Sequence, residues 1–251
     1  MLEGVKIMDR TIWTAIIASI GGLIVITLAV IGITNTVAVS ITRPMEQLGE
    51  DMKTIGQGNL EHKATIIRND EVGDIAMQLN GMVDKMTELA TKDTLTGIRN
   101  RTAYDKEMQE LNWSIADGMT DFGIVMIDMN YLKRINDIYG HEKGNIAMKK
   151  LCHIVCDVFV HSPVFRIGGD EFIVILKNHD LEHVDALISE FNLQLITIKH
   201  NARLEPWEKV SAAIGYAVFD NKTDTSIENV FKRADKAMYA RKKEMKAVRM
   251  D

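Results

Sequence analysis

The longest apolar stretch of the chain lies near its beginning. Residues 11–42 contain no charged side chain, and Arg10 and Arg43 bound the stretch. Residues 12–33 are mostly apolar, and about 22 residues span roughly 33 Å as a helix, which is enough to cross the hydrocarbon core of a bilayer. A secretory signal peptide has a shorter apolar core followed by a small-residue cleavage site. The pattern therefore predicts one membrane-spanning helix.

The charges that flank this segment do not determine its orientation in the membrane. Lys6 and Arg10 on one side nearly balance Arg43 and Lys53 on the other, so the positive-inside rule has little to act on. No later segment is apolar enough to cross a membrane. The sequence therefore predicts that about 200 residues lie together on one side of the membrane.

After Pro44 the apolar positions take on helical spacing. Proline suits the first turn of a helix, where its missing N–H costs nothing. Two runs follow, separated by a turn-rich connector: Met45, Leu48, Met52 and Ile55, then Val72, Ile75, Leu79, Met82, Met86 and Leu89. Alternating spacings of three and four are typical of parallel coiled helices, and two amphipathic helices in a globular core remain the alternative.

From residue 92 onward, strand and helix patterns alternate. Apolar runs at residues 122–129, 164–167, 172–176 and 210–219 predict strands, and helical spacing covers residues 142–159, 181–198 and 227–246. The glycines at 168 and 169 predict a hairpin turn between the second and third strands. The order α-β-α-α-β-β-α-β-α predicts an α/β (α+β) domain, a central mixed sheet covered by helices.

Composition excludes several classes of protein. The chain is 46% hydrophobic and 26% charged with a net charge of −5, which argues against a general nucleic-acid binder. Its two cysteines, Cys152 and Cys156, lie four residues apart on a predicted helix, and we interpret them as buried thiols. Because the seven histidines have no ligand spacing with these cysteines, the sequence predicts no zinc site.

Three carboxylates stand at the ends of predicted strands. Asp128 interrupts an apolar strand near its end, and Asp170 and Glu171 lie in the hairpin turn. If the two strands are neighbours, these like charges repel one another unless a cation lies among them. Oxygen-only ligands favour Mg²⁺, which usually takes one or two carboxylates together with substrate phosphates.

Four basic side chains are candidates for contacts with those phosphates: Lys133, Arg166, Lys242 and Lys246. The chain contains neither the GxxxxGK[ST] loop nor the GxGxxG turn, so a P-loop or Rossmann site is excluded. Each residue alone has a plain structural interpretation, since a lone Asp is usually a cap and a lone Lys a solvated charge. The combination of residues carries the functional hypothesis.

Four motifs together resemble the GGDEF family, the diguanylate cyclases. They are RIGGDEF at residues 166–172, DTLTGIRNR at 93–101, DMNYLKRINDIYGHEKGN at 128–145 and ADKAMYARK at 234–242. The probability of a chance match to the pentapeptide GGDEF at residues 168–172 alone is on the order of one in ten thousand. The resemblance covers residues 92–249 and implies a palm-like core.

The preceding segment resembles the HAMP family of membrane signal relays. The resemblance covers residues 41–91 and rests on Pro44 and on the sequence DEVG at residues 70–73. It implies a parallel four-helix bundle built by two chains. The expected division is therefore a tail and span (1–43), a HAMP relay (44–91) and a GGDEF cyclase domain (92–251).

The GGDEF resemblance implies that two GTP molecules condense to cyclic di-GMP with loss of two pyrophosphates. It assigns metal ligands to Asp128, Asp170 and the Met129 carbonyl, for two Mg²⁺ per site with Mn²⁺ as an alternative. Catalytic roles fall to Asp170, Glu171 and Lys133. Substrate contacts fall to Asn136, His141, Asn145, Arg166, Lys242 and Lys246.

Three positions depart from the family pattern. Asn145 replaces an aspartate that faces the Watson–Crick edge of guanine, and an amide offers that edge only one acceptor. Phe159 and Ser162 replace the arginine and aspartate of the family's inhibitory product site. Met245-Lys246-Ala247 replaces the closing GRN, which keeps a positive charge but loses the planar guanidinium.

The resemblances predict a single-pass homodimer in the cell (inner) membrane with a cytoplasmic cyclase domain. GTP is the substrate, membrane lipid surrounds the span, nucleic acid is not a partner, and the sensor partner is not identified. Two alternatives stay open: a degenerate GTP-binding regulatory module, and a cyclase whose base choice is relaxed through Asn145. The intact Asp128, Asp170 and Lys242 favour an enzyme.

Overall fold

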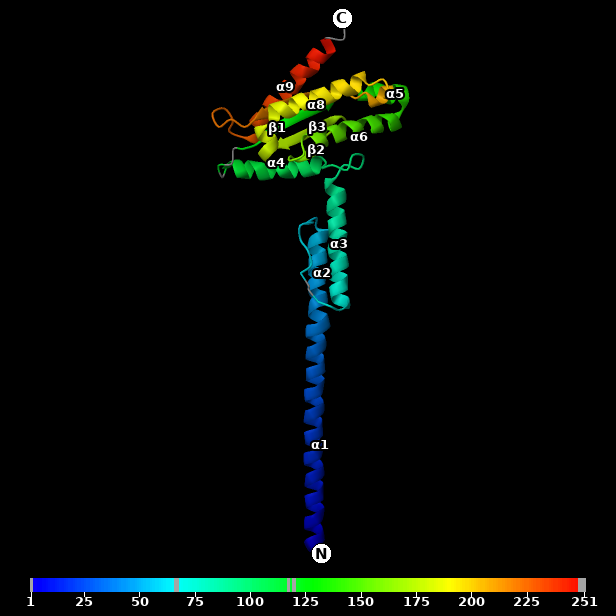
Figure 1. Cartoon of the computed structure of the whole chain (residues 1–251). Coiled ribbons are helices and arrows are strands. Elements are labelled where there is room, and N and C mark those ends of the chain that lie inside the picture. The colour runs from blue at the N-terminus through cyan, green and yellow to red at the C-terminus, as the bar shows by residue number, and fades with distance from the viewer. Residues whose placement is uncertain (1, 66–67, 117, 119–120, 248–251) are drawn as a thin grey trace. The chain divides into compact units, whose positions relative to one another are not determined.

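The computed structural model describes residues 2–65, 68–116, 118 and 121–247, with side chains described from residue 12 onward (Figure 1). The chain divides into two compact units, Met1–Thr87 and Glu88–Asp251. Lys6 and Arg10, which enter the charge balance around the span, have side chains outside the described residues.

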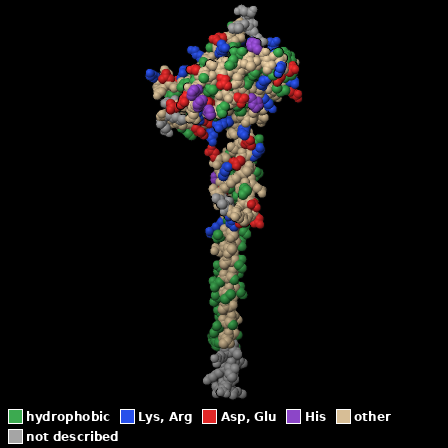
Figure 2. Space-filling model, viewed as in Figure 1, with side chains coloured by type: hydrophobic (Ala, Val, Ile, Leu, Met, Phe, Trp, Pro, Cys, Tyr) green, Lys and Arg blue, Asp and Glu red, His purple; other side chains and the backbone are tan. Residues whose placement is uncertain are grey.

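The first unit begins with a long helix, α1 (Leu2–Val37). Its described side chains are exposed from Ile12 to Val37, and one helical stretch is long and apolar enough to cross a membrane. Figure 2 shows this part of the helix covered by apolar side chains. Thr27 and Thr36 donate their hydroxyls to the carbonyls of Leu23 and Gly32, which satisfies both groups within the helix.

The helix continues through a π-helical turn, Ala38–Thr42, into α2 (Arg43–Gly56). Pro44 has no N–H to donate to the carbonyl of Ser40, four residues earlier, and its ring crowds that carbonyl. The wider π turn relieves this conflict. Nη1 of Arg68 donates to the Ser40 oxygen at 2.8 Å, so the carbonyl keeps a hydrogen bond.

Two helices of the first unit enclose a small apolar core. The helix α3 (Glu71–Thr91) contributes Ala76, Leu79 and Val83, and α2 contributes Leu48 and Ile55. Asn80 ties the connector to α3, because its side chain exchanges two hydrogen bonds with the backbone of Ala64.

This core uses only part of the apolar spacing seen in the sequence. Six of the ten positions with heptad spacing are exposed within the single chain: Met45, Met52, Ile75, Met82, Met86 and Leu89. The helix α3 thus carries two stripes, one packed on its own chain and one turned outward. The periodicity alone did not separate these two stripes, since Ala76 and Val83 lie outside the three–four alternation.

The second unit contains most of the regular structure. Its elements are α4 (Arg101–Ala116), β1 (Gly123–Met129), α5 (Leu132–Tyr139), α6 (His141–Val158), β2 (Val164–Arg166), β3 (Glu171–Leu176), α7 (Asn178–Glu182), α8 (Val184–His200), a 3₁₀ turn (Pro206–Glu208), β4 (Ala212–Val218) and α9 (Ile227–Ala247). The predicted order of elements is confirmed, with α7 as an additional short helix.

The four strands form one sheet in the order β2-β3-β1-β4. All of its strand pairs are antiparallel, whereas the sequence predicted a mixed sheet. After the crossover through α5 and α6, β2 runs parallel to β1, but the two strands do not pair because β3 lies between them. The parallel pairing that remains among the described residues is an isolated bridge between Arg99 and Phe165. The predicted α/β (α+β) class, a sheet covered by helices, is confirmed.

Alternating residues of β1 face two separate cores. Val125 and Ile127 pack with α6 and α8, and Cys152 belongs to this core, as expected for a buried thiol. Ile124 and Met126 face the opposite core, which includes residues of α4 and α9. A Cβ built on Gly215 of β4 would lie 2.0 Å from the backbone nitrogen of Met238, so α9 packs on β4 at a distance that only glycine allows.

Candidate active site

The sheet register brings the first two acidic residues together. Asp128, near the end of β1, pairs directly with Glu171, the first residue of β3. Asp128 is only 5% exposed, because it continues a strand that is buried along its whole length. The sequence predicted that these carboxylates would converge if the two strands were neighbours, and the antiparallel pairing of β1 with β3 meets that condition.

The turn between β2 and β3 holds the third carboxylate beside this pair. The backbone nitrogen of Met129 donates to the carbonyl of Asp170 at 2.8 Å, and Ile167 closes the turn through the carbonyl of Glu171. A Cβ at Gly168 would lie 2.8 Å from Oε2 of Glu171, so a side chain here would crowd the carboxylate. The predicted hairpin is confirmed, and it anchors Asp170 against the end of β1.

The electrostatics of this cluster are those of crowded carboxylates. Burial raises the pKa of Glu171, and the negative charges of Asp128 and Asp170 raise it further, while Lys242 opposes the shift. Nζ of Lys242 lies 2.6 Å from both carboxylate oxygens of Asp128. Lys242, from α9, therefore supplies a positive charge where the three carboxylates meet.

The donor set fits a hard divalent cation. Asp128, Asp170 and Glu171 provide carboxylate oxygens at the ends of adjacent strands, and the neighbouring backbone provides carbonyl oxygens. Mg²⁺ prefers oxygen ligands and is held in many phosphate-handling sites by one or two carboxylates. Burial and the nearby charges of Asp128 and Asp170 both raise the pKa of Glu171, and a cation placed among these carboxylates would oppose that shift, as Lys242 does.

Arg166 has protein partners in this structure. Its Nη1 lies 2.9 and 3.1 Å from the two carboxylate oxygens of Asp93, and its Nη2 donates to the Gly169 carbonyl at 2.7 Å. Burial alone would raise the pKa of Asp93, but hydrogen bonds from Thr96 and Arg166 outweigh it and hold that pKa below its usual value. Arg166 thus braces the hairpin turn from the side of the DTLTG motif.

The remaining predicted substrate residues lie on and around α5, α6 and α9. Asn136 packs against Gly144, where an added Cβ would lie 1.8 Å from its Oδ1. His141 and Asn145 are exposed in the first turns of α6, after Gly140 turns the chain with a φ of 85°. Lys133 is exposed at the start of α5, and Lys246 is exposed near the end of α9.

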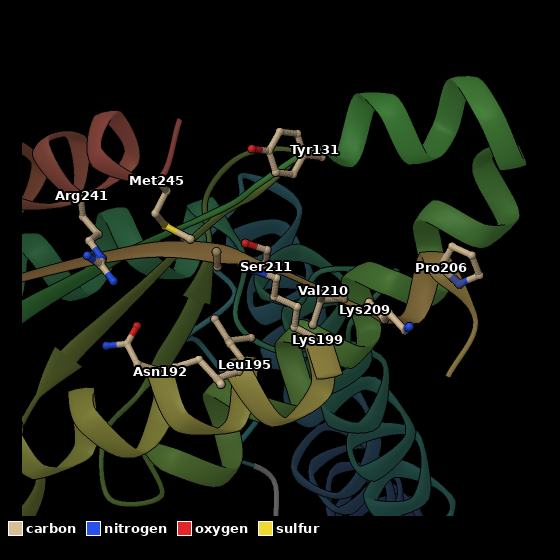
Figure 3. A pocket seen from close by; sticks show the side chains of 12 residues that line it. Tyr131, Asn192, Leu195, Lys199, Pro206, Lys209, Val210, Ser211, Arg241 and Met245 are labelled. Atoms are coloured by element: carbon tan, nitrogen blue, oxygen red, sulfur yellow. The ribbon is translucent and has the colours of Figure 1, made fainter. Parts of the chain in front are cut away.

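A cavity of about 540 Å³ lies beside this site, between α8, α9 and the start of β4 (Figure 3). Its lining combines three basic residues, Lys199, Lys209 and Arg241, with apolar side chains that include Leu195 and Met245. The predicted substrate residues do not line it. The cavity is therefore a feature separate from the acidic cluster.

Two features of the site were not assigned a role from the sequence. One is Asp93, whose partner Arg166 lies 73 residues away; the DTLTG motif was the only signal for it. The other is Asn130, which donates through its backbone to the Ser211 carbonyl at 2.7 Å and through its side chain to the Ser211 hydroxyl at 3.2 Å. No sequence signal pointed to Ser211, because the pairing depends on β1 and β4 being neighbours.

Comparison with known protein families identifies both parts of the chain. Residues 90–247 match the family described as diguanylate cyclase, GGDEF domain, and residues 36–88 match the HAMP domain. The GGDEF match covers more than half of the chain, and the chain therefore belongs to the GGDEF family of diguanylate cyclases. Both resemblances read from the sequence motifs are confirmed.

Curated relatives match about three fifths of the chain. A membrane protein of Staphylococcus haemolyticus is 28% identical over 155 residues, covering 61% of this chain and 43% of the relative. A membrane protein of Staphylococcus aureus strain USA300 is 27% identical over 153 residues, covering 60% and 42%. The chain thus spans less than half the length of these relatives.

Solved structures share the fold. The coiled coil and GGDEF domain of DgcB from Caulobacter crescentus, in complex with c-di-GMP, superposes with a TM-score of 0.60 at 24% identity, covering 68% of this chain and 90% of that one. The GGDEF domain of DgcB alone superposes with a TM-score of 0.54 at 26% identity, covering 62% of this chain and 91% of that one. The diguanylate cyclase SiaD from Pseudomonas aeruginosa, in complex with its activator SiaC, superposes with a TM-score of 0.54 at 16% identity, covering 94% of this chain and 85% of that one.

Proposed function

We propose that this chain is a membrane-bound diguanylate cyclase that condenses two GTP molecules to cyclic di-GMP and two pyrophosphates. The observation that carries the proposal is the cluster of Asp128, Asp170 and Glu171 at adjoining strand ends, with Lys242 bonded to Asp128. A domain that had lost catalysis would be expected to lose a metal ligand first, and all of these positions are intact.

The proposed reaction is two identical phosphoryl transfers. In each, the ribose 3′-oxygen of one GTP bonds to the α-phosphorus of the other, and the bond from that phosphorus to the pyrophosphate oxygen breaks. Asp170 accepts the proton of the attacking hydroxyl. Lys133, Lys242 and Lys246 offset the charge of the phosphates, while Glu171 supports the acidic cluster.

Asp128, Asp170 and the Met129 carbonyl are the residues that would hold divalent metal, with two Mg²⁺ per site as the proposed complement and Mn²⁺ as an alternative. Bound metal supplies positive charge that stabilises the triphosphate and lowers the pKa of the attacking hydroxyl. Asn136, His141 and Asn145 are proposed to bind the nucleotide. Arg166 is proposed to orient the turn that carries Asp170, in addition to any contact with phosphate.

The reaction requires two facing half-sites, and we propose that two chains supply them as a homodimer. The exposed stripe of α3, with Ile75, Met82, Met86 and Leu89, supports this arrangement. Apolar side chains at this spacing gain stability when a second helix covers them. The proposed division into a tail and span (1–43), a relay (44–91) and a cyclase domain (92–251) makes the relay the element that sets the distance between half-sites.

We further propose that α1 anchors the dimer as a single pass in the cell (inner) membrane, with the cyclase domain in the cytoplasm. The uncharged stretch of residues 11–42 and the exposed apolar side chains of α1 support the span. GTP is a cytoplasmic nucleotide, and a GTP-consuming domain therefore has its substrate on that side.

Incubation of the detergent-solubilised chain with Mg²⁺ and GTP, followed by mass identification of products, tests the proposal. We expect cyclic di-GMP and pyrophosphate in a ratio of one to two. Asp170→Ala should leave a folded protein with no turnover, because it removes a carboxylate from a turn rather than a core contact. Asp157→Ala, an exposed carboxylate on α6, serves as the matched control. Near-normal turnover of Asp170→Ala would contradict the assignment.

A further inference from the structure

Three ligand-type side chains meet on the second unit, away from the acidic cluster. His161 precedes β2, and His179 and Asp180 belong to α7, and the potential ligand atoms of all three lie within 4.8 Å of one another. Figure 2 shows histidine side chains gathered on the surface of this unit. The group contains imidazole nitrogens as well as a carboxylate, so it differs in chemistry from the all-oxygen catalytic cluster.

The β2–β3 hairpin is what assembles this group. Ser162 accepts a hydrogen bond from the backbone nitrogen of Lys177 at 3.2 Å, and the carbonyl of Pro163 accepts one from Ile175. These bonds place the residue before Ser162 next to the start of α7. The convergence of His161 with His179 therefore follows from strand register, and the sequence spacing of 18 residues did not reveal it.

Asp180 is built into the site rather than lying loose on the surface. It is 1% exposed, and its Oδ2 accepts the backbone N–H of His161 at 3.0 Å. Its Oδ1 lies 4.0 Å from Nδ1 of His179. A buried carboxylate is costly unless it is paired, and a metal ion held together with the two imidazoles supplies the charge that it lacks.

A third histidine flanks the group. The ring of His183 stacks on that of His179 with centroids 4.1 Å apart, and its Nδ1 lies 2.9 Å from the carbonyl oxygen of His179. A hydrogen bond from Nδ1 to a backbone carbonyl is the usual way in which a metal-binding histidine is oriented, and it leaves Nε2 for the metal. In this position the stacked ring of His183 supports His179, and His183 would have to give up its Nδ1 hydrogen bond and change rotamer to serve as a fourth ligand.

We propose that His161, His179 and Asp180 form a binding site for a divalent transition metal, with Zn²⁺ as the best match. Two imidazole nitrogens and one carboxylate oxygen are a ligand set that Zn²⁺ accepts, with water or His183 in the fourth position. Mg²⁺ prefers oxygen ligands and is a poor match for imidazole. The sequence pattern predicted no zinc site, because the histidines have no ligand spacing with the two cysteines and His161 meets His179 only in the fold.

The position of the site gives it a structural consequence. The strand β3 begins at Glu171 in the acidic cluster and ends at Leu176, two residues before α7. A metal that joins the segment before β2 to α7 clamps the end of the hairpin opposite to the GGDEF turn. Binding to the folded chain should therefore stabilise the second unit, and the stabilisation should grow with the logarithm of the free metal concentration above the dissociation constant.

The direct test is a Zn²⁺ titration of the detergent-solubilised full chain after chelator treatment and dialysis, at about pH 7.5, where imidazole is neutral. We expect one Zn²⁺ per chain, a rise in thermal midpoint with Zn²⁺, and no competition from excess Mg²⁺. Substitution of Co²⁺ should give the intense visible absorption of a tetrahedral site. His161→Ala and His179→Ala should each weaken binding at least about tenfold.

Two controls separate this site from other ligands. His153→Ala removes an exposed histidine on α6, and Cys156→Ser removes the less buried thiol; both should bind Zn²⁺ as the parent does. Asp180→Asn keeps an acceptor for the N–H of His161 but removes the charged ligand. In the absence of metal, its thermal midpoint should therefore equal that of the parent, and its affinity for Zn²⁺ should be weaker. The absence of saturable binding, or binding equal in the parent and the two histidine variants, would overturn the proposal.

Discussion

At the scale of single residues, the contact between Arg166 and Asp93 links two motifs that are far apart in the sequence. The guanidinium joins the Asp93 carboxylate to the Gly169 carbonyl in the turn that carries Asp170. The bridge uses two nitrogens of one rigid planar guanidinium, whereas a lysine carries all its donors on a single flexible nitrogen and cannot reproduce this fork. The bridge therefore contributes to stability and to the position of the GGDEF turn.

The first prediction concerns the pH dependence of that contribution. Asp93→Asn should lower the free energy of unfolding at pH 7 by about 1–2 kcal/mol, because a charged hydrogen-bonded pair is lost. The folded-state pKa of Asp93 is below its usual value, so its stabilisation is complete above the unfolded pKa of about 3.9 and disappears as pH falls through the lower folded pKa.

Thermal unfolding of the parent and the variant between about pH 7 and pH 3 measures this difference. The two midpoints should converge toward the acid end of the range. Asp157→Asn, on an exposed position, provides the control and should follow the parent throughout. A difference that stays constant with pH would show that the Asp93 charge does not contribute.

The second prediction concerns base choice at Asn145. This residue is exposed in the first turns of α6, near Asn136, in the region proposed to bind the nucleotide. An amide offers one acceptor to guanine, but pairs well with adenine by accepting from N6–H and donating to N1. We therefore expect cyclic di-GMP as the main product, with a mixed GMP–AMP dinucleotide when ATP is in excess.

Asn145→Asp should sharpen the preference for GTP by roughly tenfold and lower its KM. Product ratios from equimolar ATP and GTP, resolved by mass spectrometry, give the comparison. Equal ratios for the two proteins would mean that this position does not contact the base.

The third prediction concerns feedback by the product. The sequence resemblance aligns Phe159 and Ser162 with the inhibitory arginine and aspartate of the family, and both residues are buried here, at 1% and 8% exposure. Neither supplies a guanidinium or a carboxylate to a ligand. Calorimetric titration of cyclic di-GMP into the nucleotide-free protein should therefore show no tight binding at this face, and tight binding of a product dimer there would contradict the prediction.

At the scale of elements, the packing of α9 on β4 positions Lys242. Gly215 lets the backbone of α9 approach the sheet, and Lys242 lies one helical turn after Met238, the residue at that contact. The lysine reaches Asp128 from this helix. The distance between α9 and the sheet is therefore coupled to the geometry of the acidic cluster.

The fourth prediction tests that coupling. Gly215→Ala introduces a Cβ only 2.0 Å from a backbone nitrogen, so α9 must move away from β4. We expect a loss of about 1–3 kcal/mol in the free energy of unfolding together with reduced turnover. Gly169→Ala, where the added Cβ has no neighbour within 4 Å, serves as the control for stability alone. Equal stability of Gly215→Ala and the parent would show that α9 can adjust without cost.

At the scale of the whole molecule, activity is proposed to depend on how two chains associate. The burial of the α3 side chains decides which of them can test this. Leu79 is buried in the core of its own chain, so a charge there would disrupt the relay itself, whereas Met82 and Met86 are 55% and 52% exposed. The outward stripe of α3 can therefore be altered without changing the inner one.

The fifth prediction is that Met82→Glu combined with Met86→Glu weakens the dimer and makes specific activity fall on dilution. The reason is that two buried charges would face each other across the seam. Met77→Glu is the matched control, because Met77 is 73% exposed on the same helix but lies outside the stripe. Sedimentation of the solubilised protein together with activity at several concentrations provides the measurement. Activity of the double variant that does not change with concentration would remove the relay from the mechanism.

Much of this protein is determined by local sequence. The apolar segment, the alternation of strands and helices and the GGDEF turn are periodic or contiguous patterns, and each depends on residues within one or two turns of one another. The positions of Asp128 and of the hairpin at strand ends were also predictable, whereas their convergence depended on β1 and β3 being neighbours. The sequence by itself therefore determined the long apolar helix, the class of fold and the family.

Only the tertiary structure decided which distant residues meet. The order β2-β3-β1-β4 placed β3 between β1 and β2, which made the sheet antiparallel. The same register joined His161 to His179, while the packing of two helices decided which stripe of α3 is buried. Local periodicity specifies the face of an element, but the partner of that face depends on long-range pairing and packing.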